Sequence, residues 1–233
     1  MQLKPFNSFM QGVKDCVPTL LGYLSIGFAA GVIEAAAGFS MLEIVLLSVF
    51  LYAGSAQFIA ASMVSAAASA ASITATVFFV NARHQLLSAA LAPHFREYSA
   101  GKNFLIGAQL TDETFGVAVT RLNGSVPHKD AWMLGLNMTA QLNWIAANVV
   151  GAALGGWIPH PERYGLEYAL PAMFIGLLAI QFMNRKEWVR DLSVTVASVV
   201  LFIVSFELLP GSIAVMTSSV GAAALGAVIE RWK

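Results

Sequence analysis

Residues 44–82 read IVLLSVFLYAGSAQFIAASMVSAAASAASITATVFFVNA, and these 39 residues contain no charge. As one helix at ~1.5 Å per residue they would extend about 59 Å, roughly twice the ~30 Å hydrocarbon core of a bilayer. The stretch is therefore expected to cross a membrane twice. Arg83, His84 and Gln85 follow directly, and a charge inside lipid costs about 2.5–3.5 kcal/mol. This cluster predicts a polar pathway through the membrane.

The composition indicates a membrane protein. Hydrophobic residues make up 58% of the 233 residues and charged residues 11%, whereas a typical soluble domain has about 25% charged residues. The 13 basic and 13 acidic residues leave no net charge to attract nucleic acid, so no nucleic-acid partner is expected. We predict an all-α, polytopic transmembrane helix bundle that forms one integral membrane domain over residues 1–233, with the lipid bilayer around it.

The uncharged stretches define the expected spans. They are residues 16–33, 44–64, 70–91, 131–161 and 168–182, followed by two spans within 192–229 that Pro210 and Gly211 separate. The turn between the second and third spans is expected within residues 65–72, and Pro93 should end the third. Residues 103–120 are long enough to cross but carry Asp112 and Glu113 at their middle. The count is eight spans if this segment crosses and seven if it re-enters.

The distribution of basic residues favours eight spans with both termini in the cytoplasm. That arrangement leaves three basic residues outside, Arg96, Lys102 and Arg163. It places nine inside, namely Lys4, Lys14, Arg121, Lys129, Arg185, Lys186, Arg190, Arg231 and Lys233.

Three expected spans carry polar residues at helical spacing, and such stripes face protein or water because lipid offers no hydrogen bonds. They are Thr74, Asn81, His84, Gln85 and Ser88; Gln109, Asp112, Glu113, Gly116 and Thr120; and Asn137, Gln141, Trp144 and Asn148. One interpretation is that the three stripes line one cavity. The other is that these side chains hold helices together, each contributing about 0.6 kcal/mol, and that Asp112 and Glu113 mark a loop between two half-helices.

Gly54 and Ser55 lie within the second span, where they predict a loosened helix that exposes backbone groups, as in substrate-binding spans. The same Ser55 with His84 on the next span would suit an intramembrane serine hydrolase, in which a histidine activates the nucleophile. Arg83 beside that histidine would lower its basicity, so an enzyme is not expected. A structural or assembly subunit without transport activity is a further alternative.

Three strings resemble the signatures of the AzlC family, large subunits of bacterial branched-chain amino acid exporters. They are YAGSAQF at residues 52–58, NARHQLLS at 81–88 and LTDETF at 110–115, and the likeness extends over about residues 15–120. Ala82 and Gln85 depart from the apolar residues expected beside the Arg-His pair. The resemblance implies export of valine, leucine, isoleucine and methionine across the bacterial inner membrane. It also implies a heteromeric permease whose second, small hydrophobic subunit has about four spans of ~20 apolar residues.

An amino acid is a zwitterion, so its transporter needs a cation or helix N-termini for the carboxylate and oxygen atoms for the ammonium group. We expect Arg83 to bind the carboxylate, and Asp112 or Glu113 with Gln57 to bind the ammonium. Phe78, Phe79, Phe115 and Trp144 would form an apolar wall. The expected substrate-binding residues are Gly54, Ser55, Gln57, Asn81, Arg83, Phe115 and Gln141.

The sequence contains no phosphate-binding loop of the Gly-x-x-x-x-Gly-Lys-Ser/Thr type, so transport should use a gradient, as in a secondary transporter. His84, Asp112 and Glu113 are the groups that could carry a proton, and proton antiport is the expected mechanism. Cys16 is the sole cysteine, and neither a metal nor a cofactor is expected.

Overall fold

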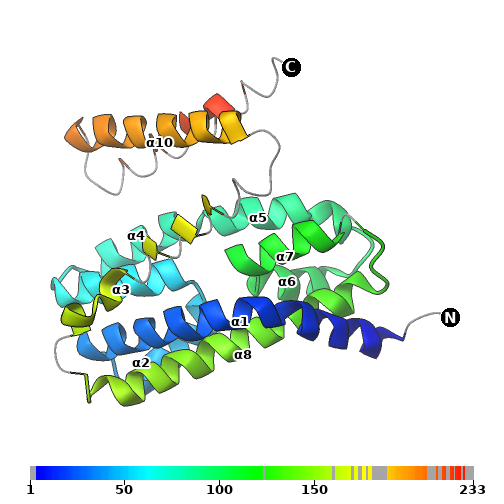
Figure 1. Ribbon diagram of the computed structural model, residues 1–233. Coiled ribbons are helices and arrows are strands. Elements are labelled where there is room, and N and C mark those ends of the chain that lie inside the picture. Colours follow the sequence, from blue (N-terminus) through cyan, green and yellow to red (C-terminus); the bar gives the residue numbers. More distant parts are fainter. Residues whose placement is uncertain are drawn as a thin grey trace. The chain divides into compact units, whose positions relative to one another are not determined.

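The computed structural model describes residues 4–122, 124–158, 161–168, 171–172, 175–176, 178–179, 188–208, 214, 217–218, 221–222, 224–226 and 228. In this part of the chain every regular element is helical, which confirms the predicted all-α class (Figure 1). The chain divides into two compact units, Met1–Pro171 and Ala172–Lys233.

Two long parallel helices form the frame of the larger unit. They are α1 (Pro5–Ala36) and α8 (Lys129–Gly155), which lie side by side along their lengths in Figure 1. A Cβ on Gly12 would lie 2.0 Å from the Trp132 carbonyl oxygen, and one on Gly31 would lie 2.1 Å from that of Asn148. The glycines therefore let the two backbones touch, as in other close helix pairs in membranes. We call the end where both helices begin the near end, and the other the far end.

A hairpin of two short helices enters the larger unit from the far end. Its first arm is α2 (Met41–Leu46) with a π-helical turn, η1 (Leu47–Leu51), and its second arm is α3 (Gly54–Ser65). Gln57 on the second arm lies beside Ser48 on the first, with 3.4 Å between Nε2 and Oγ. A straight helix would separate these residues by about 13 Å along its axis. The predicted crossing at residues 44–64 is therefore wrong, because the chain reverses at Tyr52 and Ala53.

The third expected span is helical but contains a break. The helices α4 (Ala70–Asn81) and α5 (Arg83–Leu91) follow one another in line, from the far end to the near end (Figure 1). Ala82 separates them, and η2 (Ala92–His94), which contains Pro93, ends the span as predicted. The turn before α4 also lies where it was expected, and the Ser69 hydroxyl caps α4 by accepting from the Ser72 N–H at 3.2 Å.

A second hairpin enters from the near end. It consists of α6 (Ala100–Ala108) and α7 (Asp112–Leu122). Lys102 pairs with Asp130 at the start of α8, whereas Gln109 at the tip reaches Gln141 near the middle of that helix. Arg121 then returns to the near end and pairs with Asp15 of α1 at 3.2 Å. Residues 103–120 thus re-enter and do not cross.

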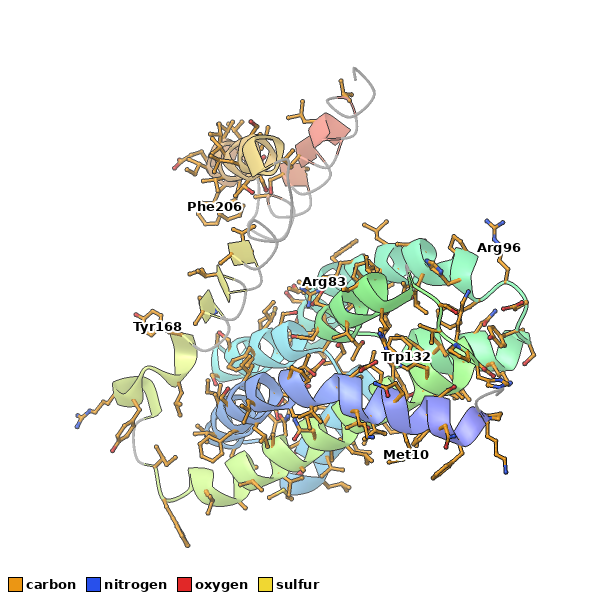
Figure 2. The ribbon with its side chains drawn as sticks, turned by 45° about the vertical axis from the view of Figure 1, so that its right-hand side comes forward. Met10, Arg83, Arg96, Trp132, Tyr168 and Phe206 are labelled. Atoms are coloured by element: carbon orange, nitrogen blue, oxygen red, sulfur yellow. The ribbon has the colours of Figure 1, made fainter. Side chains whose placement is uncertain are left out.

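This second hairpin corrects the predicted side of two basic residues. Lys102 lies at the near end with Asp130, and Figure 2 labels Arg96 at the same end of the larger unit. The prediction that both lie opposite Arg121 and Lys129 is therefore wrong. Residues 44–64 and residues 103–120 form hairpins, and the lysines and arginines of residues 4–168, apart from Arg83 at the break between α4 and α5, become more one-sided. Six lie at the near end, Lys4, Lys14, Arg96, Lys102, Arg121 and Lys129; Arg163 lies at the far end, after α8.

The remaining described elements are short or belong to the smaller unit. The helix α8 covers most of the fifth expected span, residues 131–161, and two single turns follow it, η3 (Pro161–Tyr164) and η4 (Leu166–Tyr168). In the smaller unit, α10 (Trp188–Leu208) agrees with the span expected from residue 192 to Pro210. The spans expected at residues 168–182 and beyond Gly211, with Arg185, Lys186, Arg231 and Lys233, lie largely outside the described residues.

The described helices have surfaces that suit lipid. Among them α1 is the one helix that is both long and apolar enough to cross a membrane unbroken. The third expected span is divided between α4 and α5, and α4 has no buried residue. Large apolar side chains such as Leu21, at 76% exposure, and Phe50, at 82%, lie on the surface of the larger unit. Exposed apolar surface on this scale indicates a nonaqueous environment.

Candidate functional site

The three sequence strings all lie where helices are interrupted. The first contains the reversal at Tyr52 and Ala53, the second contains Ala82 between α4 and α5, and the third contains Thr111 at the tip of the second hairpin. Half-helices that end inside a membrane protein present unpaired backbone groups, which transporters use to bind substrates. The interruptions therefore define a candidate site in the larger unit.

Arg83 joins the three interruptions. Its Nη2 atom donates a hydrogen bond to Ser55 Oγ at 2.7 Å and lies 3.1 Å from Asp112 Oδ2. Ser55 belongs to the first hairpin and Asp112 to the second, so one guanidinium connects the tips of both with the break in the crossing segment (Figure 2 labels Arg83). The arginine and aspartate side chains retain 28% and 23% exposure, so this ion pair is only partly buried.

Asp112 and Glu113 stand in the first turn of α7, where carboxylates favour the helix dipole. Thr111 caps this turn, since its hydroxyl accepts from the Thr114 N–H at 3.3 Å and Thr114 Oγ1 accepts from the Thr111 N–H at 3.0 Å. The alternative interpretation, in which Asp112 and Glu113 mark a loop between two half-helices, is thus correct as a description of local structure. It is compatible with a binding role, because Asp112 also faces Arg83.

Tyr23 of α1, which no sequence pattern singled out, holds Glu113 in place. Its hydroxyl donates to Glu113 Oε2 at 2.9 Å, which leaves the Thr111 hydroxyl to donate to Tyr23. The Tyr23 ring also packs edge-on against Trp144, with 5.7 Å between ring centroids. Glu113 is therefore directed toward α1, whereas Asp112 is directed toward Arg83.

The N-terminus of α3 lies beside Arg83 without a side-chain cap. Ala53 precedes the helix and offers its first N–H groups no side-chain acceptor, and Ser55 is buried. Tyr52 adopts a left-handed conformation with φ of 40°, which is strained for a large side chain and typical of functional positions. A Cβ on Gly54 would lie 3.0 Å from Trp144 Cη2, so the aromatic ring closes this side of the site.

Gln57 belongs to a separate buried network, which includes Glu34, a residue that the sequence analysis did not select. The Gln57 amide donates to Glu34 Oε1 at 2.8 Å and accepts from the Trp144 indole N–H at 2.8 Å. Glu34, Gln57 and Asn148 are fully buried. Glu34 lies near the end of α1, but the first hairpin and α8 cover it. Gln57 thus contacts this carboxyl, and its hydrogen bonds are directed away from Arg83.

The polar stripe on α8 mainly holds the hairpins. Asn137 donates to the Ile106 carbonyl at 3.1 Å, which fixes α6. Gln141 donates to the Val49 carbonyl at 3.0 Å and accepts from Gln109 Nε2 at 2.7 Å, so one side chain ties both hairpins to α8. These contacts support the interpretation of the stripe as interhelical hydrogen bonding.

The other predicted site residues surround Arg83 less directly. His84 is half-buried on the first turn of α5, and Phe115 packs against the buried core. Asn81 ends α4, and its Oδ1 atom is buried with no hydrogen-bond partner among the described residues. The aromatic pair expected in the apolar wall is exposed, Phe78 at 61% and Phe79 at 42%. Of the four aromatic residues proposed for that wall, Phe115 and Trp144 are the two packed inside.

The contacts of Ser55 do not match those of a catalytic serine. Its hydroxyl accepts a hydrogen bond from Arg83, and an arginine cannot act as a general base because it stays protonated. A nucleophile needs a base at this position. The geometry therefore favours a binding role for Ser55.

Comparisons with known proteins agree with the three strings. The chain is 30% identical over 212 residues to the inner membrane protein YgaZ of Escherichia coli (strain K12), covering 88% of this chain and 86% of the relative. It is 26% identical over 212 residues to the branched-chain amino acid transport protein AzlC of Bacillus subtilis (strain 168), covering 90% and 83%. An uncharacterized membrane protein of Helicobacter pylori (strain J99) is 28% identical over 214 residues, covering 87% and 91%.

No solved structure matches the chain. A family model described as AzlC protein matches residues 18–158, which contain all three strings and both hairpins. Because this match covers more than half of the sequence, the protein belongs to the AzlC family.

Proposed function

We propose that this protein exports branched-chain amino acids across the bacterial inner membrane as the large subunit of a two-component secondary transporter. The observation that carries the proposal is the Arg83–Asp112 ion pair, which lies between the tips of two opposed hairpins. Membership of a family with a named amino acid transporter supports a transport role. The excess of basic residues at the near end supports a cytoplasmic position for that end and for the N-terminus.

The ion pair suits a zwitterion because both carry one charge of each sign. A bound amino acid replaces the internal pair: its carboxylate takes Arg83 and its ammonium group takes Asp112. The exchange leaves no charge unpaired in a poorly solvated site, where an unpaired charge is costly. Neutral amino acids are therefore preferred over lysine or glutamate, whose extra side-chain charge would have no partner in the pair.

Backbone groups complete the carboxylate site in this proposal. The uncapped N-terminus of α3 lies next to Ser55, which Arg83 already contacts. A helix N-terminus offers free N–H groups and the positive end of the helix dipole to an anion. Gly54 and Ser55 at this N-terminus would then contact the substrate, and Asn81 would supply its unsatisfied carbonyl oxygen to the ammonium group.

The apolar tail of the substrate lies against Phe115 and Trp144. Apolar pockets discriminate by only about 1–3 kcal/mol per methylene group, so valine, leucine, isoleucine and methionine are accepted together. Gln141 contributes by fixing both hairpins to α8. His84, Asp112 and Glu113 are the proposed proton carriers at this site, and a small hydrophobic membrane subunit completes the permease.

Efflux of labelled valine tests the proposal. Cells that lack their own exporters are loaded with labelled valine and compared with and without this protein, together with candidate small subunits. The proposal predicts faster valine efflux, inhibition by unlabelled leucine or isoleucine, and no competition from lysine or glutamate. Efflux that does not depend on the protein in the presence of any small subunit would refute it.

A further inference from the structure

Glu34 is a buried carboxyl group to which the proposed transport site assigns no role. It lies two residues before the end of α1, and its side chain is fully buried, although Ala36 and Gly38 at the far end are exposed. A carboxyl group one turn from the surface could easily have faced solvent. Here α3 and α8 cover it, so its burial is a property of the assembled bundle.

The orientation of the Gln57 amide shows that its NH₂ group, and not its oxygen, faces Glu34. The Trp144 indole can only donate a hydrogen bond, so the Gln57 oxygen must face it, at 2.8 Å. The Gln57 NH₂ group therefore faces Glu34 and donates to Oε1 at 2.8 Å. Oε2 of Glu34 is buried and has no hydrogen-bond partner among the described residues. One neutral donor is the only hydrogen bond that this carboxyl group receives there.

The surroundings of Glu34 contain oxygen atoms and no basic side chain among the described residues. Ser48 Oγ and Asn148 Oδ1 lie 3.4 and 3.5 Å from the same Gln57 nitrogen, so they are close to the carboxyl group as well. Along the packed elements the charged side chains point elsewhere. Glu43 of α2 is exposed and caps its own helix, and α8 carries its charges at the near end.

The other ionisable groups nearby also leave Glu34 without a cation. The segments η1 and α3 contain none, and Tyr52 is the ionisable residue between them. Arg163 and Tyr164 of η3, and Tyr168 of η4, are exposed. An ionised carboxylate buried with one neutral hydrogen bond would be very costly, and a buried acid without a cation takes up a proton instead.

We propose that Glu34 is a proton-binding site, distinct from the Arg83 site, that receives the coupling proton from the far end. The inference rests on the proposed export function, in which the far end faces outward and protons move inward as the amino acid leaves. Trp144 and Gln57 connect the two sites physically, because the same indole packs over Gly54 and donates to the amide that holds Glu34. Proton binding at Glu34 and substrate binding at Arg83 can therefore influence each other.

Infrared difference spectra between acid and alkaline pH test the proton site without transport. A carboxyl group that gains a proton shows a carbonyl band of the acid form, and this band should lose one component in Glu34→Gln. The matched control is Glu43→Gln, which also removes one titrating carboxyl group but an exposed one, so the two variants should lose different components of the band. If Glu34→Gln does not reach the membrane, Glu34→Asp retains the acid and should shift the band. A spectrum unchanged by both Glu34 variants would overturn the proposal.

Transport in proteoliposomes with the small subunit tests the coupling role. Valine accumulation driven by a pH gradient should fall about tenfold in Glu34→Gln, within the usual range of coupling between two ligands, whereas valine–valine exchange persists. Equal accumulation of valine in the wild type and in Glu34→Gln under a pH gradient would refute the coupling role of Glu34. Accumulation driven by a sodium gradient, with no band from a protonated Glu34, would refute it as well. Absence of all valine transport in the wild type, with the Glu34 band present, would instead refute the export function alone.

Discussion

Arg83 Nη2 and Asp112 Oδ2 lie 3.1 Å apart, although one belongs to a crossing segment and the other to the tip of a hairpin. The ion pair is the charged connection between the fixed crossing and the second hairpin. Removing either charge leaves the other without its partner in a partly buried position, which typically costs 2–5 kcal/mol, or roughly thirtyfold to a few thousandfold in binding. We expect Arg83→Ala and Asp112→Asn to reduce valine efflux at least tenfold at equal membrane abundance.

The variant Arg83→Lys separates the effect of the charge at position 83 from the effect of the guanidinium geometry. Arg83→Lys retains the charge but loses the planar fork that reaches Ser55 and Asp112 together, so intermediate efflux is expected. Arg96→Ala is the control, because Arg96 is exposed at the near end. Normal valine efflux in Arg83→Ala would show that the guanidinium does not bind substrate.

The contact between α1 and α8 predicts opposite effects for two glycines of the same helix. A Cβ on Gly31 would lie 2.1 Å from a backbone oxygen of α8, whereas one on Gly22 meets nothing within 4 Å. Gly31→Ala must push the two backbones apart, and overpacking of this kind costs about 1–3 kcal/mol. Gly22→Ala should leave stability unchanged or raise it by up to ~1 kcal/mol through helix propensity.

Thermal unfolding in detergent distinguishes these glycine variants. The midpoint for Gly31→Ala should fall clearly below that of the wild type, and that of Gly22→Ala should not. Equal unfolding midpoints for the two variants would show that α1 and α8 pack less closely at Gly31 than the backbone distances indicate.

The pair between Lys102 and Asp130 predicts a pH-dependent contribution to stability at the near end. Burial alone would raise the pKa of Asp130, but hydrogen bonds from Lys102 and the Ala131 N–H, together with the Lys102 charge, outweigh it and lower the pKa. A carboxyl group with a lowered folded-state pKa stabilises the fold above its unfolded pKa of about 3.9. That contribution is lost as the pH falls through the folded value.

Lys102→Met should therefore lower the unfolding midpoint slightly at neutral pH, where Asp130 is ionised. The difference from the wild type should shrink below pH ~4, the usual range of an aspartate pKa. Lys4→Met removes an equal charge from the exposed start of the chain and should show a smaller, pH-independent effect. A difference that grows in acid would contradict the assigned ion pair.

The sequence predicted those parts of the fold that depend on local apolar length and helix signals. The first span, the turn after the second segment, the end of the third span at Pro93 and the long span of α8 all follow from such signals. Residues 103–120 were recognised as ambiguous because Asp112 and Glu113 break the apolar run. The strings around Ser55, Arg83 and Asp112 were expected to share one site, and the structure brings them together, but their direct ion pair was not predicted from the sequence.

The first hairpin and Glu34 could not be predicted in the same way. A hairpin with two apolar arms has the same length and hydropathy as one crossing, and its reversal at Tyr52 contains neither a proline nor a charge. The burial of Glu34 could not be read from its sequence neighbours, because it depends on α3 and α8, which are distant in the sequence. Gln57 was assigned to the substrate for the same reason, since its contact with Glu34 exists only once α3 folds back.

Cysteine labelling tests the two hairpins directly. In a Cys16→Ser background the chain has no cysteine, so single cysteines can be placed at Lys102, at Lys129 and at Ser40. The fold places Lys102 and Lys129 at the near end, and Ser40 at the far end before α2. A membrane-impermeant maleimide added to intact cells should label the cysteine at position 40 and spare those at 102 and 129, since the near end is proposed to be cytoplasmic. Eight full crossings would place position 102 outside and position 129 inside, so labelling of position 102 together with protection of position 129 would refute the re-entrant hairpins.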